Sequence, residues 1–273
     1  MKANELYPSV FSRHAAAYAR RVDQIMARGE ARGRQRVIDL VAARPGMRIL
    51  DLACGPGNLT ARLAALVAPR GEVVGVDLAP GMIAVARDRE LPNARFEVMD
   101  IEALAFGDGS FDGATCGHGM QFVPHLDRAL SESRRVLKRG ARFAASIPVD
   151  GPAEDARQLL DRLLDRHLPP APTPVDQGVT RRTVSDPRLF AGAALKGGFN
   201  SADVEQIDET VVWPSADEFV AQITGWWACA TRLEGVDEQR QQAFVTEATQ
   251  ALRREHPGAI ETTARNLVLY AVA

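Results

Sequence analysis

The sequence contains few cysteines, few aromatic residues and almost no net charge. Its three cysteines, Cys54, Cys116 and Cys229, lie far apart and lack the spacing of metal ligands. The sequence therefore indicates neither a metal site nor a disulfide framework, and it favours free thiols in a reducing compartment. The net charge of −2 provides no basic field of the kind that binding a phosphate backbone requires, which argues against a nucleic-acid partner.

Long apolar runs are also missing. No segment approaches the roughly 20 apolar residues that a membrane span needs, and the first residues lack the apolar stretch of a signal peptide. We therefore expect a soluble, cytoplasmic protein. The 273 residues suffice for one large domain or for a domain with a sizeable insertion, and we favour the second.

The most informative segment spans residues 48–59, where an apolar strand passes through Asp51 into a glycine-spaced turn that opens a helix. Gly55 permits a sharp reversal, and Gly57 leaves no side chain between the backbone and a ligand. Backbone N–H groups at the start of the helix can then approach polar ligand atoms, so the turn indicates nucleotide binding. The third glycine of the dinucleotide fingerprint is missing, and Asp51 stands four residues before the first glycine. Both features argue against NAD.

From residue 47 to about residue 149, short apolar runs alternate with helical stretches, which predicts an α/β fold with a parallel sheet covered on both faces. Right-handed crossovers make such a sheet doubly wound. We expect strands at 47–53, 72–78, 94–100, 111–117 and 141–149. We expect helices at 58–68, 80–89 and 127–137.

The regions before and after residues 47–149 lack this alternation of strands and helices. Residues 8–43 are predicted to be mostly helical and to pack over the ligand cleft. The segment 168–174 has four prolines in seven residues, which excludes a helix there because proline lacks the N–H donor and fixes φ. After it we expect a helix ending near Lys196, an alternating run at 203–213, two helical stretches, and a last strand at 266–272.

Two acidic residues stand at strand ends. Asp77 closes the second strand twenty residues after Gly57, where a carboxylate can accept hydrogen bonds from both hydroxyls of a ribose. Its alternative role is a helix N-cap. Asp100 ends the third strand, where it can accept from an adenine amino group while Ile101 packs on the ring. Its alternative role is a cap or a turn former.

Four landmarks, together with the run from Phe111 to Phe143, resemble one enzyme family. The landmarks are Phe11-x-x-x-Ala15-Ala16-x-Tyr18, the turn from Asp51 to Gly57, Asp77-Leu-Ala-Pro-Gly-Met82, and Arg135-Val-Leu-Lys-Arg-Gly140. Over residues 8–149 the chain resembles class I S-adenosylmethionine (SAM) dependent methyltransferases, most closely the ubiquinone and menaquinone biosynthesis type (methyltransferase domain 11/25). The resemblance implies a Rossmann-like, doubly wound sheet of seven strands, mostly parallel with the last strand antiparallel.

The resemblance also implies three parts. These are an N-terminal helical segment over the cofactor cleft (1–45), a SAM-binding core (46–149), and a C-terminal half (150–273) with helical substrate-cap insertions at about 151–195 and 214–258.

The chain departs from the family at four positions. Ala53 and Ala141 replace glycines and Arg139 replaces the usual proline. These three stand at turn positions and should cost at most about 1 kcal/mol, so we expect SAM binding to be intact. Ala19 stands where the quinone enzymes often have aspartate, which casts doubt on quinone precursors as the methyl acceptor.

By resemblance, specific residues hold the cofactor. Asp77 is expected to bind the ribose, Asp100 the adenine edge, and Met82 and Ile101 the adenine faces. Tyr18 would close over the methionine end, where an aromatic face suits a cation. The full expected set is Tyr18, Asp51, Ala53, Gly55, Gly57, Asp77, Leu78, Met82, Asp100, Ile101, Gly117, Gln121 and Phe122.

The sulfonium of SAM already activates the methyl group, so the protein chiefly needs to align a nucleophile and exclude water, an effect worth up to about 7 to 11 kcal/mol. No metal is expected. His118, just past the fourth strand, is the best placed titratable side chain to act as a catalytic base. Its alternative role is to hydrogen-bond locally or to line the cofactor pocket.

The leading hypothesis is a SAM-dependent methyltransferase that methylates a carbon or oxygen, less readily a nitrogen, of a small apolar or aromatic metabolite and releases S-adenosylhomocysteine. One alternative is a SAM-fold protein that binds the cofactor without methyl transfer or catalyses a cofactor-assisted rearrangement. The other is an NAD(P)-dependent oxidoreductase. The acceptor and the oligomeric state, monomer or homodimer, stay open.

Overall fold

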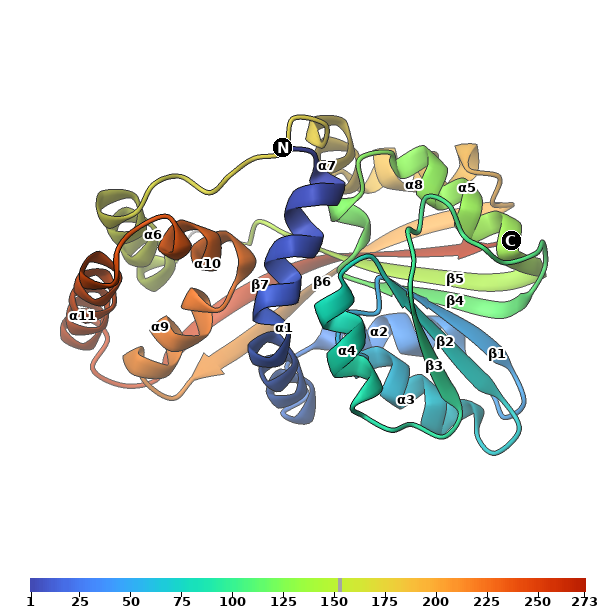
Figure 1. The fold of residues 1–273 in the computed structure, drawn as a ribbon, viewed down its shortest axis with the longest axis horizontal. Helices are drawn as coiled ribbons and strands as arrows, with labels where there is room; N and C mark the ends of the chain where they lie inside the picture. The colour runs from blue at the N-terminus through green and yellow to red at the C-terminus, as the bar shows by residue number, and fades with distance from the viewer. Residues whose placement is uncertain (152–153) are drawn as a thin grey trace. The chain divides into compact units, whose positions relative to one another are not determined.

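The structure is a computed structural model that describes residues 1–151 and 154–273. Its centre is a seven-stranded sheet with the strand order β3-β2-β1-β4-β5-β7-β6 (Figure 1). Neighbouring strands from β3 to β5 are parallel, and β7 runs antiparallel to β5. This confirms the expected doubly wound α/β sheet. The strands are β1 Arg48–Leu52, β2 Glu72–Asp77, β3 Ala94–Val98, β4 Phe111–Gly117, β5 Leu137–Val149, β6 Ser201–Trp213 and β7 Ile260–Val272.

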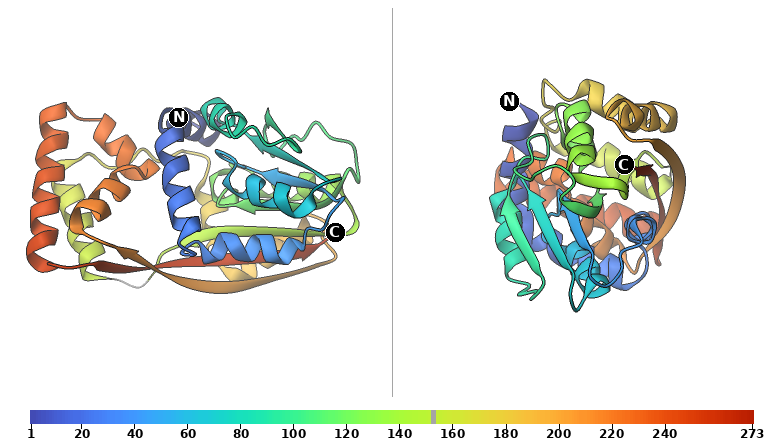
Figure 2. Two further views of the ribbon diagram at one scale, coloured as in Figure 1. Left: turned by 90° about the horizontal axis from the view of Figure 1, so that it is seen from below. Right: turned by 90° about the vertical axis from the view of Figure 1, so that its right-hand side faces the viewer.

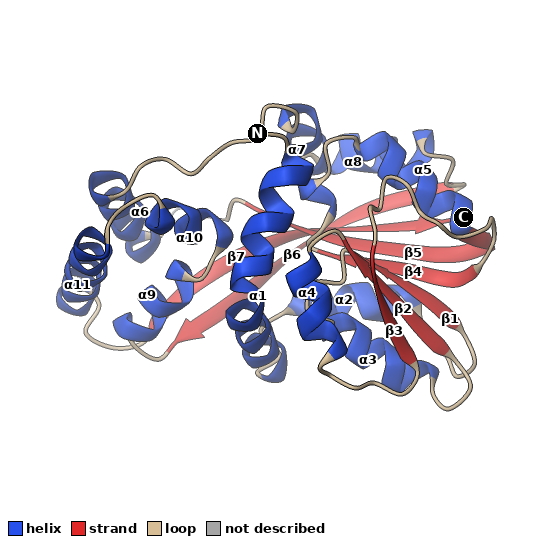
Figure 3. Ribbon diagram, viewed as in Figure 1, coloured by secondary structure: helices blue, strands red, loops and turns tan. Residues whose placement is uncertain are grey.

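Helices precede, connect and follow the strands. The N-terminal region that the sequence predicts as helical forms two helices, and the first begins at Ala3. The segment 168–174 contains no helix or strand, as its prolines predict, and is part of a loop in Figure 3. The helices are α1 Ala3–Ala27, α2 Arg32–Val41, α3 Asn58–Val67, α4 Pro80–Arg87, the 3-10 helix η1 Met120–Phe122, α5 Leu126–Val136, α6 Asp155–His167, α7 Gly178–Val184, α8 Pro187–Lys196, α9 Ala216–Thr224, α10 Trp227–Glu234 and α11 Glu238–Glu255.

The central strands are apolar on both faces because helices cover both. Ile49 of β1 and Val73 of β2 pack with residues of α2 and α3. Leu50 and Val74, their neighbours in sequence, point to the opposite face and pack with residues of α5 and α8. The right-hand view of Figure 2 shows α2 and α3 on one side of the sheet and α5 and α8 on the other.

The chain divides into two compact units. The first comprises Met1–Val149, Pro174–Asp208 and Arg265–Ala273, and the second comprises Asp150–Thr173 and Glu209–Ala264. The second unit has its own core, which includes the fully buried side chains of Leu160, Phe219 and Phe244.

The expected insertion at 151–195 is therefore split between the two units. Residues 174–195 belong with the sheet because Phe190 and Ala194 of α8 are fully buried in the core beside α5. The expectation that the insertions cap a substrate stays a prediction. Among the described residues, no helix combines the length and the apolar composition that crossing a membrane would need.

Candidate functional site

A pocket in the first unit lies at the carboxyl ends of β1 to β4, where the strand order reverses and open α/β sheets bind their ligands. Its walls come from α1, α2, the turn after β1, and the segments that follow β2, β3 and β4. Eleven of the residues expected from the sequence line it. They are Tyr18, Ala53, Gly55, Asp77, Leu78, Met82, Asp100, Ile101, Gly117, His118 and Phe122.

The turn after β1 has the tight geometry that its glycines predict. Ala53, Gly55 and Gly57 all have positive φ, at 50°, 55° and 78°. A Cβ on Gly55 would meet no atom within 4 Å, which agrees with its place on the pocket wall. A Cβ on Gly57 would lie 3.1 Å from the ring of Phe96. The structure therefore uses the missing side chain of Gly57 to admit Phe96, and it does not bring Gly57 to the pocket wall.

Asp77 faces the pocket from the end of β2. Its Oδ2 accepts a hydrogen bond from the Gly55 N–H and its Oδ1 accepts one from the Ala79 N–H, each at 2.8 Å. Burial raises the pKa of Asp77, and these two N–H groups counteract the rise. Each carboxylate oxygen keeps a further lone pair. Asp77 thus shapes the local turn and also presents acceptors that suit two ribose hydroxyls.

The next part of the pocket follows β3. Asp100 accepts a hydrogen bond from the Glu102 N–H at 2.9 Å, so it forms a turn as well as lining the pocket. Met82 and Ile101 are nearly unexposed apolar wall residues. This part of the wall therefore combines one acidic residue with two apolar residues, which suits an adenine ring.

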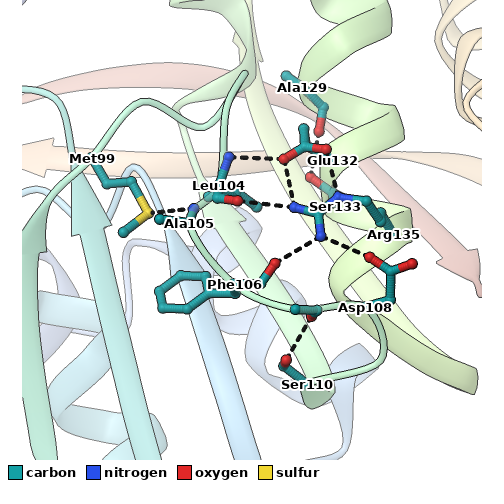
Figure 4. A network of polar contacts seen from close by, with 11 residues as sticks. Met99, Leu104, Ala105, Phe106, Asp108, Ser110, Ala129, Glu132, Ser133 and Arg135 are labelled. Carbon is teal, nitrogen blue, oxygen red and sulfur yellow. Dashed lines mark hydrogen bonds and ion pairs between the residues drawn. The ribbon is translucent and has the colours of Figure 1, made fainter.

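A polar network holds the loop after Ile101 in place (Figure 4). Arg135 of α5 donates to the carbonyl oxygens of Leu104 at 2.9 Å and Phe106 at 2.7 Å. It also pairs with Glu132 at 2.7 Å and Asp108 at 2.8 Å. Glu132 in turn accepts from the Leu104 N–H. No motif in the sequence indicated that α5 anchors the loop that follows Asp100 and Ile101.

Asp51 is not on the pocket wall. Its carboxylate is 1% exposed and accepts hydrogen bonds from the hydroxyls of Thr60 at 2.6 Å and Thr115 at 2.8 Å. Burial raises the pKa of Asp51 to about 6 despite these bonds. Asp51 therefore connects β1 to α3 and β4 behind the turn, and the structure does not bring this expected cofactor residue to the pocket.

Gln121 also lies behind the wall. Its side-chain amide donates to the His118 backbone carbonyl at 2.9 Å, and the backbone carbonyl of Gln121 accepts from the side chain of Gln177. These bonds fix the turn that carries His118 and Phe122, so Gln121 supports the pocket residues without lining the pocket.

His118 follows β4 with a φ of +63°. Its Nε2 lies 2.7 Å from Oδ1 of Asn266, a residue of β7 that is 1% exposed. Burial holds the pKa of His118 well below its usual value, and nearby Arg34 lowers it further. The imidazole is therefore neutral near pH 7. A Cβ on Gly33 of α2 would lie 2.7 Å from the Asn266 side chain, so the glycine makes room for this partner.

Some wall residues were not among the site residues expected from the sequence. The rings of Tyr7 and Phe11, from α1, lie 4.7 Å and 5.2 Å from the ring of Phe122, centroid to centroid, and form an aromatic end of the pocket. The spacing of four residues between Tyr7 and Phe11, which puts both on one face of a helix, was the signal available. Arg34 is a further wall residue, and no motif marks it.

Residues 49–140 match the family model described as a methyltransferase domain. The chain is similar to a demethylmenaquinone methyltransferase of Symbiobacterium thermophilum, with 46% identity over 105 residues that cover 37% of this chain and 42% of that protein. It is similar also to a 2-phytyl-1,4-naphtoquinone methyltransferase of Synechococcus elongatus, with 40% identity over 136 residues that cover 48% of this chain and 58% of that protein.

A solved structure has a similar fold. Phosphoethanolamine N-methyltransferase 2 of Haemonchus contortus, in complex with S-adenosyl-L-methionine, is 18% identical with a TM-score of 0.52, over 88% of this chain and 51% of that chain. At this identity the likeness concerns the fold alone. The chain spans about half the length of the two curated relatives, at 42% and 58%.

Proposed function

We propose that the chain is a SAM-dependent methyltransferase that binds SAM in the pocket of the first unit. The observation that carries the proposal is Asp77 at the end of β2, which lines the pocket, is hydrogen-bonded to the turn after β1, and lies within the segment that matches the methyltransferase domain model. The relatives named above are methyltransferases, and the solved structure of similar fold holds SAM.

The order of strands supports one orientation of the cofactor. Asp100 and Ile101 after β3 would hold the adenine and Asp77 after β2 the ribose. The turn after β1, with Ala53 and Gly55, would then hold the methionine part. Because β4 is the next strand in the sheet, this orientation would present the methyl group near the segment that begins with His118.

SAM supplies a methyl group on a positively charged sulfur, which leaves as the neutral thioether S-adenosylhomocysteine when the acceptor attacks. The chain's contribution is to align the acceptor and exclude water. The aromatic end formed by Tyr7, Phe11 and Phe122 suits a flat, apolar acceptor. We propose methyl transfer to a carbon or oxygen of such a molecule, and the quinone substrates in the relatives' names place quinone precursors in the panel to be tested.

Methyl transfer to a hydroxyl or a ring carbon requires that the acceptor lose a proton. His118 lines the pocket and is neutral, so one ring nitrogen can accept that proton. With Nε2 donating to Asn266 Oδ1, Nδ1 carries the free lone pair. We propose His118 as the base and Asn266 as the residue that orients it.

The test is methyl transfer from labelled SAM to a panel of phenols, indoles and quinone precursors, with S-adenosylhomocysteine measured in parallel. We expect equal amounts of methylated product and S-adenosylhomocysteine for at least one class. Binding of SAM without product across the panel favours a SAM-fold protein without methyl transfer. Protection from thermal unfolding by NAD(P)H, with none by SAM or S-adenosylhomocysteine, favours an oxidoreductase.

A further inference from the structure

Arg34 is a buried cation on the wall of the pocket. It lies in the first turn of α2, is 7% exposed and lines the pocket. Its Nη2 donates to the Tyr18 hydroxyl at 3.1 Å. Within residues 1–151 and 154–273, this hydroxyl is the one hydrogen-bond or ion-pair partner that Arg34 has. A guanidinium has five N–H donors, so most of its hydrogen-bonding capacity is unused.

Burying a cation without a counter-ion is costly, because the charge loses its hydration and gains no opposite charge in return. The positive field of Arg34 also acts on its surroundings. Burial lowers the pKa of Arg21 to about 9, and Arg34 contributes to that shift. Arg34 also contributes to the lowered pKa of His118. An anion placed against Arg34 would relieve the repulsion at both groups.

The acidic residues of the wall and Arg34 are associated with different strands of the sheet. Asp77 and Asp100 follow β2 and β3, the proposed adenosine side. Arg34 acts on His118, which follows β4, and a Cβ on the adjacent Gly119 would lie 2.4 Å from the Ala53 Cβ of the turn after β1. Arg34 therefore belongs to the side where the proposed orientation puts the amino-acid part of SAM.

We propose that Arg34, supported by the Tyr18 hydroxyl, binds a carboxylate in the pocket, namely the carboxylate of the methionine part of SAM. The assignment rests on the proposed function. A guanidinium binds a carboxylate through two parallel, charge-assisted hydrogen bonds, which lysine cannot reproduce. A carboxylate on the methyl acceptor has the same chemistry, and the experiment separates the two sources.

The experiment compares two ligands by calorimetry: S-adenosylhomocysteine and its decarboxylated analogue, which lacks only the carboxylate. The wild-type protein is expected to bind S-adenosylhomocysteine at least about tenfold more tightly than the analogue. In Arg34→Gln this preference should vanish, because the affinity for S-adenosylhomocysteine falls while the affinity for the analogue changes less than about twofold. Arg34→Lys should recover only part of the preference. Arg32→Gln, at an exposed arginine of the same helix, should keep it.

A second measurement separates a binding role from a structural one. Without ligand, Arg34→Met should unfold at the same temperature as the wild type or higher, since it removes a buried charge that lacks a counter-ion. A large loss of thermal stability would indicate a structural role and overturn the proposal.

Two binding results would also overturn it. One is an unchanged preference for S-adenosylhomocysteine in Arg34→Gln. The other is a variant that binds S-adenosylhomocysteine as the wild type does and still binds phenols, but no longer binds hydroxybenzoates. That result would assign Arg34 to a carboxylate on the methyl acceptor. If the wild-type protein bound neither adenosyl ligand, the proposed function itself would fail, and this assignment with it.

Discussion

Asp51 and Asp77 both stand in the carboxyl-terminal parts of central strands, yet their surroundings differ. Asp51 is enclosed and accepts hydrogen bonds from two threonine hydroxyls, whereas Asp77 accepts two backbone N–H groups and faces the pocket. Sequence position marks both as candidates. It could not separate them, because the threonines that enclose Asp51 lie 9 and 64 residues away in the chain.

The pKa of Asp51 predicts a pH dependence of stability. Its pKa is about 6 in the folded protein against an ordinary value of 3.8. Between these values the unfolded chain binds fewer protons than the folded one, so the free energy of unfolding falls as the pH rises from about 4 to 6. The expected contribution is about 3 kcal/mol, from roughly 1.4 kcal/mol per pKa unit.

Asp51→Asn removes this titration. The difference in unfolding free energy between variant and wild type, from urea titrations at pH 4 and pH 7, should therefore shift in favour of the variant at pH 7. Asp77, whose pKa is also raised by burial, is present in both proteins and largely cancels. A difference that is the same at both pH values would contradict the assignment.

His118 and Asn266 give a second prediction for single residues. If His118 accepts the acceptor's proton, His118→Ala should lower turnover by about 10²-fold or more while SAM affinity changes little. Asn266→Ala should act in the same direction through the loss of the 2.7 Å contact that orients the ring. The two measurements are turnover with saturating substrates and calorimetric affinity for SAM. Equal losses in both quantities would make His118 a pocket residue only.

At the scale of elements, the sequence predicted β1 to β4 well because each is a short apolar run between turn signals. The start of β5 and the start of β7 were placed too late in the chain. Residues 138–140 are exposed and Gly140 has a φ of +77°. These features are typical of a turn, so the strand was expected only from residue 141. In the structure, β5 already begins at Leu137. The last strand was expected from residue 266 and begins at Ile260.

The contact between α5 and the loop after β3 predicts a coupling between stability and cofactor binding. Arg135→Gln removes charge-assisted bonds to Glu132 and Asp108 and two bonds to loop carbonyls. We expect the free energy of unfolding to fall by about 1.5 to 3 kcal/mol. The affinity for SAM should also fall, because the loop carries the proposed adenine residues.

The control for this prediction is Arg139→Gln, which changes an exposed residue and should leave both quantities within experimental error. Urea unfolding and calorimetry measure the two effects. A stable Arg135→Gln protein with unaltered SAM affinity would show that the network in Figure 4 does not hold the loop.

At the scale of the whole molecule, local strand and turn patterns predicted the sheet, and the family resemblance predicted many of the residues that line the pocket. The division into units was less accessible, since α7 and α8 join the sheet through the burial of a few apolar residues such as Phe190. Arg34 and Asn266 escaped prediction for a related reason. Each is a single polar residue without a motif, and its role arises only when distant segments meet.

The central claim is that the pocket at the carboxyl ends of β1 to β4 binds SAM through Asp77. It is tested most directly by the calorimetric affinity of S-adenosylhomocysteine for the wild type, Asp77→Ala and Asp88→Ala, where Asp88 is an exposed aspartate at the end of α4. We predict binding to the wild type and to Asp88→Ala, and a dissociation constant at least about tenfold higher for Asp77→Ala, from the loss of charged hydrogen bonds. Equal affinity for all three proteins, or no binding to the wild type, would contradict the claim.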